Sequence, residues 1–88
     1  MSSRDDISRL IENQELDKAL ELVSGFPEQE ADTWYLKGKV YSRMGKMSEA
    51  LSCYIKALDI DPNHGEAAAM IELSNRIYSF KDPNRYNH

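Results

Sequence analysis

Apolar residues recur at three- and four-residue spacing along almost the whole chain, and this helical period constrains the fold more than any other feature. The period places Ile7, Leu10 and Ile11 on one face of a short first helix, which the polar pair Asn13-Gln14 interrupts. No stretch of the sequence alternates polar and apolar residues in the manner of a half-buried strand. The sequence therefore predicts an all-α fold.

Glycine and proline indicate where the first helices end. Gly25 is expected to close the second helix in a left-handed conformation, and Pro27 to lie in the first turn of the third helix. The third helix is expected to run from about residue 28 or 30 to residue 44, and Gly45 should end it. Short helices joined by such turns predict antiparallel hairpins.

The second half of the chain continues in the same way. A fourth helix begins near Met47, and Asp61-Pro62-Asn63 ends it because residues before proline avoid the helical conformation. Asn63 is then expected to cap a fifth helix over residues 64–80, with His64 as a capping or solvent residue. The prediction is an array of about five helices arranged as antiparallel hairpins.

Residues 31–64 carry a more specific motif. Within these 34 residues, small and aromatic side chains stand at fixed offsets, namely Trp34, Gly38, Tyr41, Ala50, Tyr54, Ala57 and Pro62. At these offsets the segment closely resembles one unit of the tetratricopeptide-repeat (TPR) family. Lys37 stands where the family pattern has leucine, and Tyr54 replaces a phenylalanine. The small residues would let the two helices cross closely, and the aromatic residues would fill the space between them.

The flanking segments resemble the family less closely. Lys18-Ala19-Leu20-Glu21 lies 31 residues before Glu49-Ala50-Leu51-Ser52, rather than 34, so the register of the first hairpin stays open. Downstream, Ala68 lies 34 residues after Trp34, and Glu72 takes the position of the glycine. The resemblance implies one TPR-like domain over residues 1–81, with a degenerate hairpin (1–27), a repeat unit (31–64), a capping helix (64–80) and then an irregular polar tail (82–88).

The resemblance also implies a binding groove. In arrays of this family the first helix of each unit lines a concave groove, where a peptide of a partner protein docks. The matching positions combine apolar groups with positive charge, and they are Tyr35, Lys39, Ser42, Arg43, Leu73, Arg76 and Ile77. An extended peptide with an acidic group and an apolar anchor would fit this surface. The alternative is that the cations form an ordinary solvated helix face.

Further groove positions follow from the same resemblance. Asp32 and Glu66 lie on this side of the third and fifth helices, and Arg4, Ser8 and Ile11 are candidates from the first helix.

A second function, in structural assembly, is the alternative to peptide docking. Leu73, Ile77 and Phe80 form an apolar stripe beside the one expected to face the fourth helix. Because the outer face of a capping helix is normally polar, this stripe is expected to be covered by the N-terminal hairpin, the tail or a second copy of the chain. Arrays with fewer than three repeats are also marginally stable alone. A homodimer is therefore the alternative expectation.

No constellation of side chains predicts catalysis. His64 and His88 have no partner at metal-ligand spacing, and the sequence contains no glycine-rich phosphate loop. Cys53 is expected to be a half-buried structural thiol, because no electropositive helix start surrounds it. We therefore expect no enzyme activity, no catalytic residue, no metal and no cofactor.

The charge and hydropathy of the chain indicate which class of partner it binds, among nucleic acids, membranes and proteins. The 15 acidic residues outnumber the 11 basic ones and are mixed with them, whereas a nucleic-acid binder normally presents a basic face. No stretch approaches the ~20 apolar residues of a membrane span. The acidic start of the chain lacks the apolar core of a signal peptide, and a single cysteine forms no internal disulfide. We expect a cytoplasmic protein that binds a protein or peptide, with no nucleic acid and no membrane.

Overall fold

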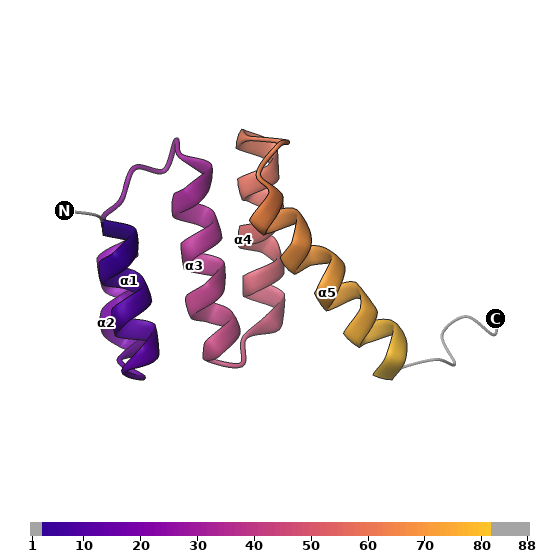
Figure 1. The fold of residues 1–88 in the computed structure, drawn as a ribbon, viewed down its shortest axis with the longest axis horizontal. Coiled ribbons are helices and arrows are strands. Elements are labelled where there is room, and N and C mark those ends of the chain that lie inside the picture. Colours follow the sequence, from indigo (N-terminus) through magenta and orange to yellow (C-terminus); the bar gives the residue numbers. More distant parts are fainter. Residues whose placement is uncertain (1–2, 82–88) are drawn as a thin grey trace.

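The computed structural model describes the backbone of residues 3–81 and the side chains of residues 4–75. Within these residues the chain forms five α-helices and no strand (Figure 1). They are α1 (Ser3–Glu12), α2 (Leu16–Val23), α3 (Ala31–Arg43), α4 (Met47–Ile60) and α5 (Gly65–Lys81). The all-α array of helical hairpins is thus confirmed, and the tail predicted at 82–88 lies outside the described residues. None of these helices combines the length and the apolar character that crossing a membrane requires.

A left-handed residue closes α3. Gly45 has a φ of +83°, and its N–H donates to the carbonyl of Ser42 at 3.1 Å. The next amide, of Lys46, donates to the carbonyl of Tyr41 at 2.9 Å. This pair of hydrogen bonds is a Schellman motif, in which glycine is favoured because it has no side chain to oppose a positive φ.

α1 ends in the same motif, with Gln14 at the position of the glycine. Gln14 has a φ of +64°, and the amides of Gln14 and Glu15 donate to Ile11 and Leu10 at 3.0 and 2.9 Å. Gln14 precedes Gly45 by 31 residues, so these hydrogen bonds establish the register that the sequence left open. With this offset the fully buried residues match in pairs, Ala19 with Ala50 and Val23 with Tyr54.

The connection between α2 and α3 differs from the sequence-based prediction. Gly25 does not take a left-handed conformation; its N–H instead donates to the carbonyl of Leu22 at 3.1 Å in a tight turn. Pro27 lies in the connection and outside the first turn of α3, which begins only at Ala31. The prediction was wrong at both positions because α2 stops after 8 residues and leaves a longer turn than the sequence suggested.

The start of α5 also differs. His64, and not Asn63, caps this helix, because His64 Nδ1 accepts a hydrogen bond from the amide of Ala67 at 3.2 Å. The amide of Asn63 donates to Asp61 Oδ1 at 3.0 Å, which holds Asn63 in the preceding turn. An imidazole nitrogen therefore takes the role expected of an amide oxygen.

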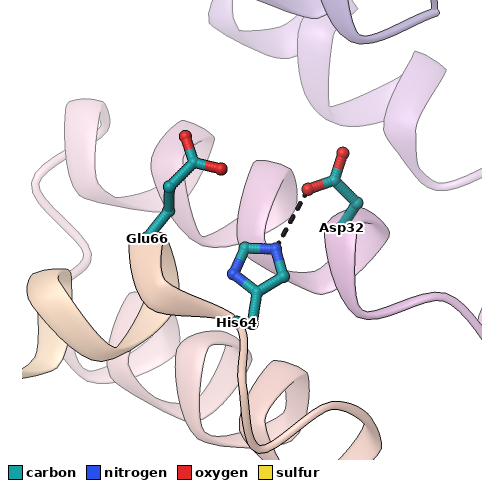
Figure 2. Close-up of side chains that lie close together, drawn as sticks. All are labelled: Asp32, His64 and Glu66. Carbon is teal, nitrogen blue, oxygen red and sulfur yellow. Dashed lines mark hydrogen bonds and ion pairs between the residues drawn. The ribbon is translucent and has the colours of Figure 1, made fainter.

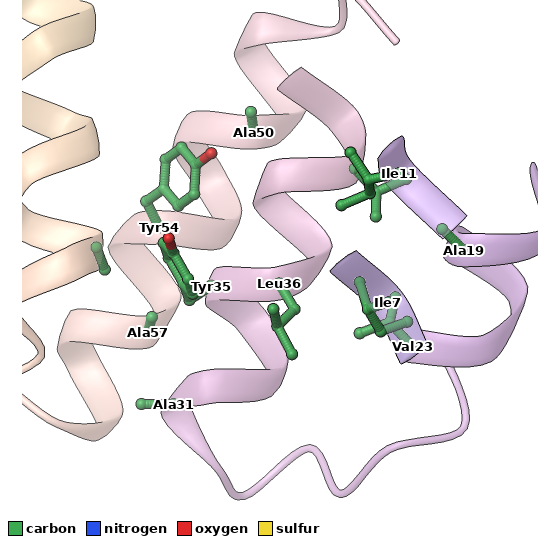
Figure 3. Close-up of a cluster of buried hydrophobic side chains, with 12 residues drawn as sticks. Ile7, Ile11, Ala19, Val23, Ala31, Tyr35, Leu36, Ala50, Tyr54 and Ala57 are labelled. Carbon is green, nitrogen blue, oxygen red and sulfur yellow. The ribbon is translucent and has the colours of Figure 1, made fainter. Parts of the chain in front are cut away.

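The core depends on one close helix crossing. Tyr54 of α4 is fully buried, and its ring lies against the backbone of α3 at Gly38. A methyl group at Gly38 would lie 2.5 Å from Cε1 of Tyr54, so only glycine permits this approach. Around this contact the buried core extends from the first hairpin to α5 (Figure 3), and it includes Ile7, Ile11, Ala19, Val23, Leu36, Val40, Ala50, Ala57 and Ala67.

The outer face of α5 differs from the matching face of α3. Glu72 stands 34 residues after Gly38 and is exposed, as are Ala68 and Asn75 on the same side. Ala67, by contrast, is fully buried against the core. A helix could not pack against α5 at Glu72 as α4 packs at Gly38. This polar face is typical of a helix that ends an array.

Gly38→Ala should lower the free energy of unfolding by about 2 kcal/mol, because overpacking at Tyr54 outweighs the better helix propensity of alanine. Gly65→Ala is the matched control, since a Cβ there meets no atom within 4 Å. Urea unfolding followed by circular dichroism measures both variants. Equal stability of the parent and Gly38→Ala would show that the crossing tolerates a side chain.

Tyr54→Phe should raise the free energy of unfolding by about 1 kcal/mol, because the buried Tyr54 hydroxyl has no hydrogen-bond partner among the described residues. Burial raises the pKa of Tyr54 to about 12, well above its usual value. An unfolded phenol ionises near pH ~10, so the folded chain should lose stability as the pH rises from that value. Denaturant unfolding across this pH range should show a smaller loss in Tyr54→Phe, and a less stable variant would contradict the prediction.

Candidate protein-binding face

Helices α1, α3 and α5 share one face on which a charged side chain joins all three. The Arg4 guanidinium, from α1, donates through Nη1 to both carboxylate oxygens of Asp32 on α3 at 2.8 and 2.9 Å. Through Nη2 it donates to both oxygens of Glu66 on α5 at 2.7 and 2.6 Å. The hydrogen bond to Glu66, assisted by the charges of Asp32 and Glu66, raises the pKa of Arg4 above its usual value. We call the surface formed by seven residues the first-helix face; they are Arg4, Asp32, Tyr35, Lys39, Arg43, Glu66 and Leu73.

Tyr35 forms the floor beneath this ion-pair network. The Arg4 Cζ atom lies 5.3 Å from the centre of the Tyr35 ring, and the Lys39 Nζ atom lies 5.7 Å from it, so both cations interact with the π-system. The ring also packs at 5.2 Å from the ring of His64 and at 6.1 Å from the ring of Tyr54. Burial, with the nearby charge of Glu66, raises the pKa of the Tyr35 hydroxyl. Tyr35 thus connects the surface network to the core.

His64 orients the Asp32 carboxylate through a hydrogen bond. Figure 2 shows Asp32, His64 and Glu66 pointing toward one another, with His64 Nε2 at 3.0 Å from Asp32 Oδ1. Because His64 Nδ1 accepts the amide of Ala67, the hydrogen-bond pattern places the proton of the neutral ring on Nε2, which donates it to Asp32. The α5 cap and the orientation of the Asp32 carboxylate therefore depend on one imidazole.

The same three side chains offer ligand atoms within 4.8 Å of one another, which is close enough for a metal ion. A metal at His64 Nε2 would move the ring proton to Nδ1, where it would face the Ala67 amide and find no acceptor. Both carboxylates are also engaged by Arg4. The arrangement accordingly suits a guanidinium better than a metal ion.

The predicted groove residues differ in their exposure. Tyr35 is only 6% exposed and belongs to the core, whereas Leu73 is 50% exposed. Ser42 is half-buried and donates a weak hydrogen bond to Met47 Sδ at 3.8 Å, and Arg43 is exposed. The structure thus brings Tyr35 and Lys39 together in one contact. The side chains of three further residues of the sequence-based prediction, Arg76, Ile77 and Phe80, lie outside the described part.

The family resemblance places Arg4, Asp32 and Glu66 on this side of the array but does not pair them. Arg4 precedes Asp32 by 28 residues and Glu66 by 62, and neither separation carries a local signal. The role of His64 beneath Asp32 was also missed, because the sequence indicated only a cap or a solvent residue. The internal offset of 31 residues gives Arg4 and Tyr35 equivalent positions in successive helices. This is the one sequence pattern that could have placed Arg4 beside the Tyr35 ring.

A separate open hollow of about 580 Å³ is lined by Glu28, Gln29, Trp34 and Lys56. Trp34 Nε1 donates to the carbonyl of Glu28 at 2.9 Å, and the ammonium groups of Lys37 and Lys56 lie 5.0 and 5.8 Å from the indole centre. The chain's own groups therefore already engage the polar and aromatic parts of Trp34.

Cys53 is buried, more deeply than the half-buried position expected from the sequence. Burial raises the pKa of the Cys53 thiol, which disfavours the reactive thiolate.

The ion pairs of Arg4 should couple α1 to the rest of the array. In a double-mutant cycle, Arg4→Met and Asp32→Asn are expected to show a coupling free energy of about 1 kcal/mol, because Nη1 of Arg4 contacts both oxygens of Asp32 while both side chains are partly exposed. The coupling should shrink at ~1 M salt, where exposed charges are screened. Denaturant unfolding provides the measurement.

The matched control for this cycle is Arg9→Met with Asp6→Asn, also on α1. Arg9 is 72% exposed and lies 3.9 Å from Asp6, so its coupling should be near zero. Equal coupling in the two cycles would contradict a structural role for Arg4.

Comparison with known proteins finds similarity centred on residues 31–64. A family model described as the tetratricopeptide repeat matches these residues. Over 34 residues, 39% of this chain, the sequence is 47% identical to the TPR repeat-containing protein MJ0941 of Methanocaldococcus jannaschii and covers 10% of that protein. Over 48 residues, 49% of this chain, it is 35% identical to Protein NPGR2 of Arabidopsis thaliana and covers 6% of it. The chain thus spans a tenth or less of the length of these relatives. No solved structure matches the chain.

Proposed function

We propose that this chain, whose residues 31–64 match the tetratricopeptide-repeat model, is a non-catalytic module that binds a peptide or helix of a partner protein on its first-helix face. Repeats of this kind are protein-interaction modules. Helical spacing carries the proposal, because it places two cations of α3 and an exposed apolar side chain of α5 on the side of the array that Asp32 and Glu66 occupy. Lys39 and Arg43 supply the charge, and Leu73 supplies the apolar contact.

The charges favour a partner with an acidic group. Among the described residues neither Lys39 nor Arg43 forms an ion pair, so both can pair with a carboxylate of the partner. Leu73, half exposed on α5, offers a contact for an apolar anchor. An acidic and apolar peptide would therefore find complementary groups on this face.

We propose a cytoplasmic location and no cofactor, metal or catalytic residue for this module. A buried free thiol at Cys53 and a net charge of −4 fit a protein of a reducing compartment whose partners are proteins rather than nucleic acids.

The alternative function is assembly with a second copy or with a larger helical structure through α5. Its support is the exposure of Leu73, a large apolar side chain on α5. The other two members of the predicted stripe, Ile77 and Phe80, lie outside the described side chains.

Site-specific photo-crosslinking tests the two functions together. A photoreactive amino acid at Leu73 should crosslink a partner protein in a lysate of the source cells, and the same group at exposed Ser52 on α4 should not. Lys39→Glu with Arg43→Glu should abolish the Leu73 crosslink, because reversed charge repels an acidic partner. Mass spectrometry identifies the products. We leave Tyr35 unchanged, because truncating a residue that is only 6% exposed would open the core.

The control for charge reversal is Lys18→Glu with Lys46→Glu, two exposed cations on α2 and in the turn before α4. The control variant should keep the crosslink. If the Leu73 product contains only a second copy of the chain, the assembly function replaces peptide binding. A partner that both charge variants retain would contradict the role of Lys39 and Arg43.

A further inference from the structure

We propose that Asp32, Tyr35 and Glu66 form a binding pocket for an arginine side chain of the partner peptide, and that Arg4 of α1 occupies this pocket until the partner displaces it. We call these three residues the guanidinium pocket. The proposal rests on the proposed function. It adds a second contact, in which carboxylates of the chain bind a positively charged side chain of the partner. Arg4 acts as an internal substitute for the ligand.

The pocket is complementary to a planar guanidinium. Its occupant makes four hydrogen bonds of 2.6 to 2.9 Å, two to each of two carboxylates, and stacks its Cζ atom 5.3 Å from the Tyr35 ring centre. One guanidinium nitrogen faces each carboxylate, Nη1 toward Asp32 and Nη2 toward Glu66. A lysine ammonium has one nitrogen and no rigid plane, so it cannot place a separate nitrogen against each carboxylate. The geometry therefore selects arginine over lysine.

The pocket is built without α1. Asp32 is oriented by His64, which α5 positions through its own N-cap. The Tyr35 ring packs against Tyr54 of α4 and against His64. These contacts join α3, α4 and α5, so the guanidinium pocket should keep its shape when Arg4 leaves.

Arg4, by contrast, is easy to displace. It is the second residue of α1, in the first turn of the helix, where the backbone N–H groups have no partner inside the helix. Its side chain is 37% exposed and that of Glu66 is 55% exposed, so an incoming guanidinium can reach the carboxylates from solvent. Two carboxylates also leave one negative charge uncompensated by a single arginine, which favours approach of a cation.

The positions of the charges along α3 set the spacing between the charged residues expected in the bound peptide. Asp32 is in the first turn of α3, while Lys39 and Arg43 lie seven and eleven residues further along. At 1.5 Å per helical residue these separations are roughly 10 and 16 Å. An extended peptide spans them in about three to five residues. The partner should therefore carry an arginine about three to five residues from an acidic residue.

N-acetyl-argininamide, compared with the isosteric and uncharged N-acetyl-citrullinamide, tests the pocket on the full chain. Amide chemical shifts of Asp32, Tyr35 and Glu66 in NMR spectra report binding. In Arg4→Ala the arginine probe should bind at least tenfold more tightly than the citrulline probe. In the parent its binding should be weaker, because Arg4 competes for the same carboxylates.

Two variants keep the test specific. Arg4→Ala combined with Asp32→Asn and Glu66→Gln should lose the preference for arginine, because the shapes remain while the charges are gone. If Arg4→Ala loosens α1, Arg4→Met preserves the aliphatic packing and should show the same preference. Equal binding of the two probes in both Arg4 variants would overturn the proposal, as would shifts that the charge-neutral variant retains.

The outcome is separable from that of the proposed function. The crosslink at Leu73 depends on Lys39 and Arg43, whereas the preference for arginine depends on Asp32 and Glu66. A partner captured at Leu73 together with no preference for arginine overturns the guanidinium pocket alone. A preference for arginine with no captured partner supports the pocket and counts against the wider peptide-binding function.

Discussion

The close crossing of α3 and α4 depends on the contact between Gly38 and Tyr54. Because Gly38 has no side chain, the Tyr54 ring can lie against the α3 backbone and fill the space between the two helices. Tyr54 in turn supports Tyr35, whose ring carries the charged network of the first-helix face. At the position of α5 that matches Gly38 stands an exposed glutamate, Glu72, so the same close crossing is not possible there. The absence of a side chain at Gly38 thus supports both the core and the surface network above it.

The first-helix face separates its charges along the helix axis. The carboxylates of Asp32 and Glu66 lie in the first turns of α3 and α5, where the positive end of the helix dipole favours negative charge. Arg43 lies in the last turn of α3, where the dipole favours a cation, and Lys39 lies one turn before it. From the sequence alone, the cations of this face predict an acidic partner. The structure adds a carboxylate region that Arg4 already fills, so an acidic peptide alone would use only part of the face.

The local hydrogen-bonding chemistry of single residues explains which helix ends could be predicted. Gly45 closes α3 as expected, because a positive φ suits glycine wherever a helix must stop. Gln14 closes α1 in the same geometry, and its residue type does not predict a positive φ. His64 replaces Asn63 as the cap of α5 because its ring reaches the Ala67 amide, a choice between two neighbouring polar residues that propensity does not decide. A helix end was thus predictable from the sequence where a single residue type strongly favours the backbone conformation that ends the helix.

The sequence by itself determined the helices, the small and aromatic residues at the helix crossing, and the repeat at residues 31–64. These features follow from periodicity and from steric size, which act over a few residues. Only the tertiary structure decided the register of the first hairpin and the joining of Arg4 to Asp32 and Glu66. The physical reason is distance along the chain, because an ion pair between residues 62 positions apart forms only after the packing of α3, α4 and α5 has brought the carboxylates within reach of α1.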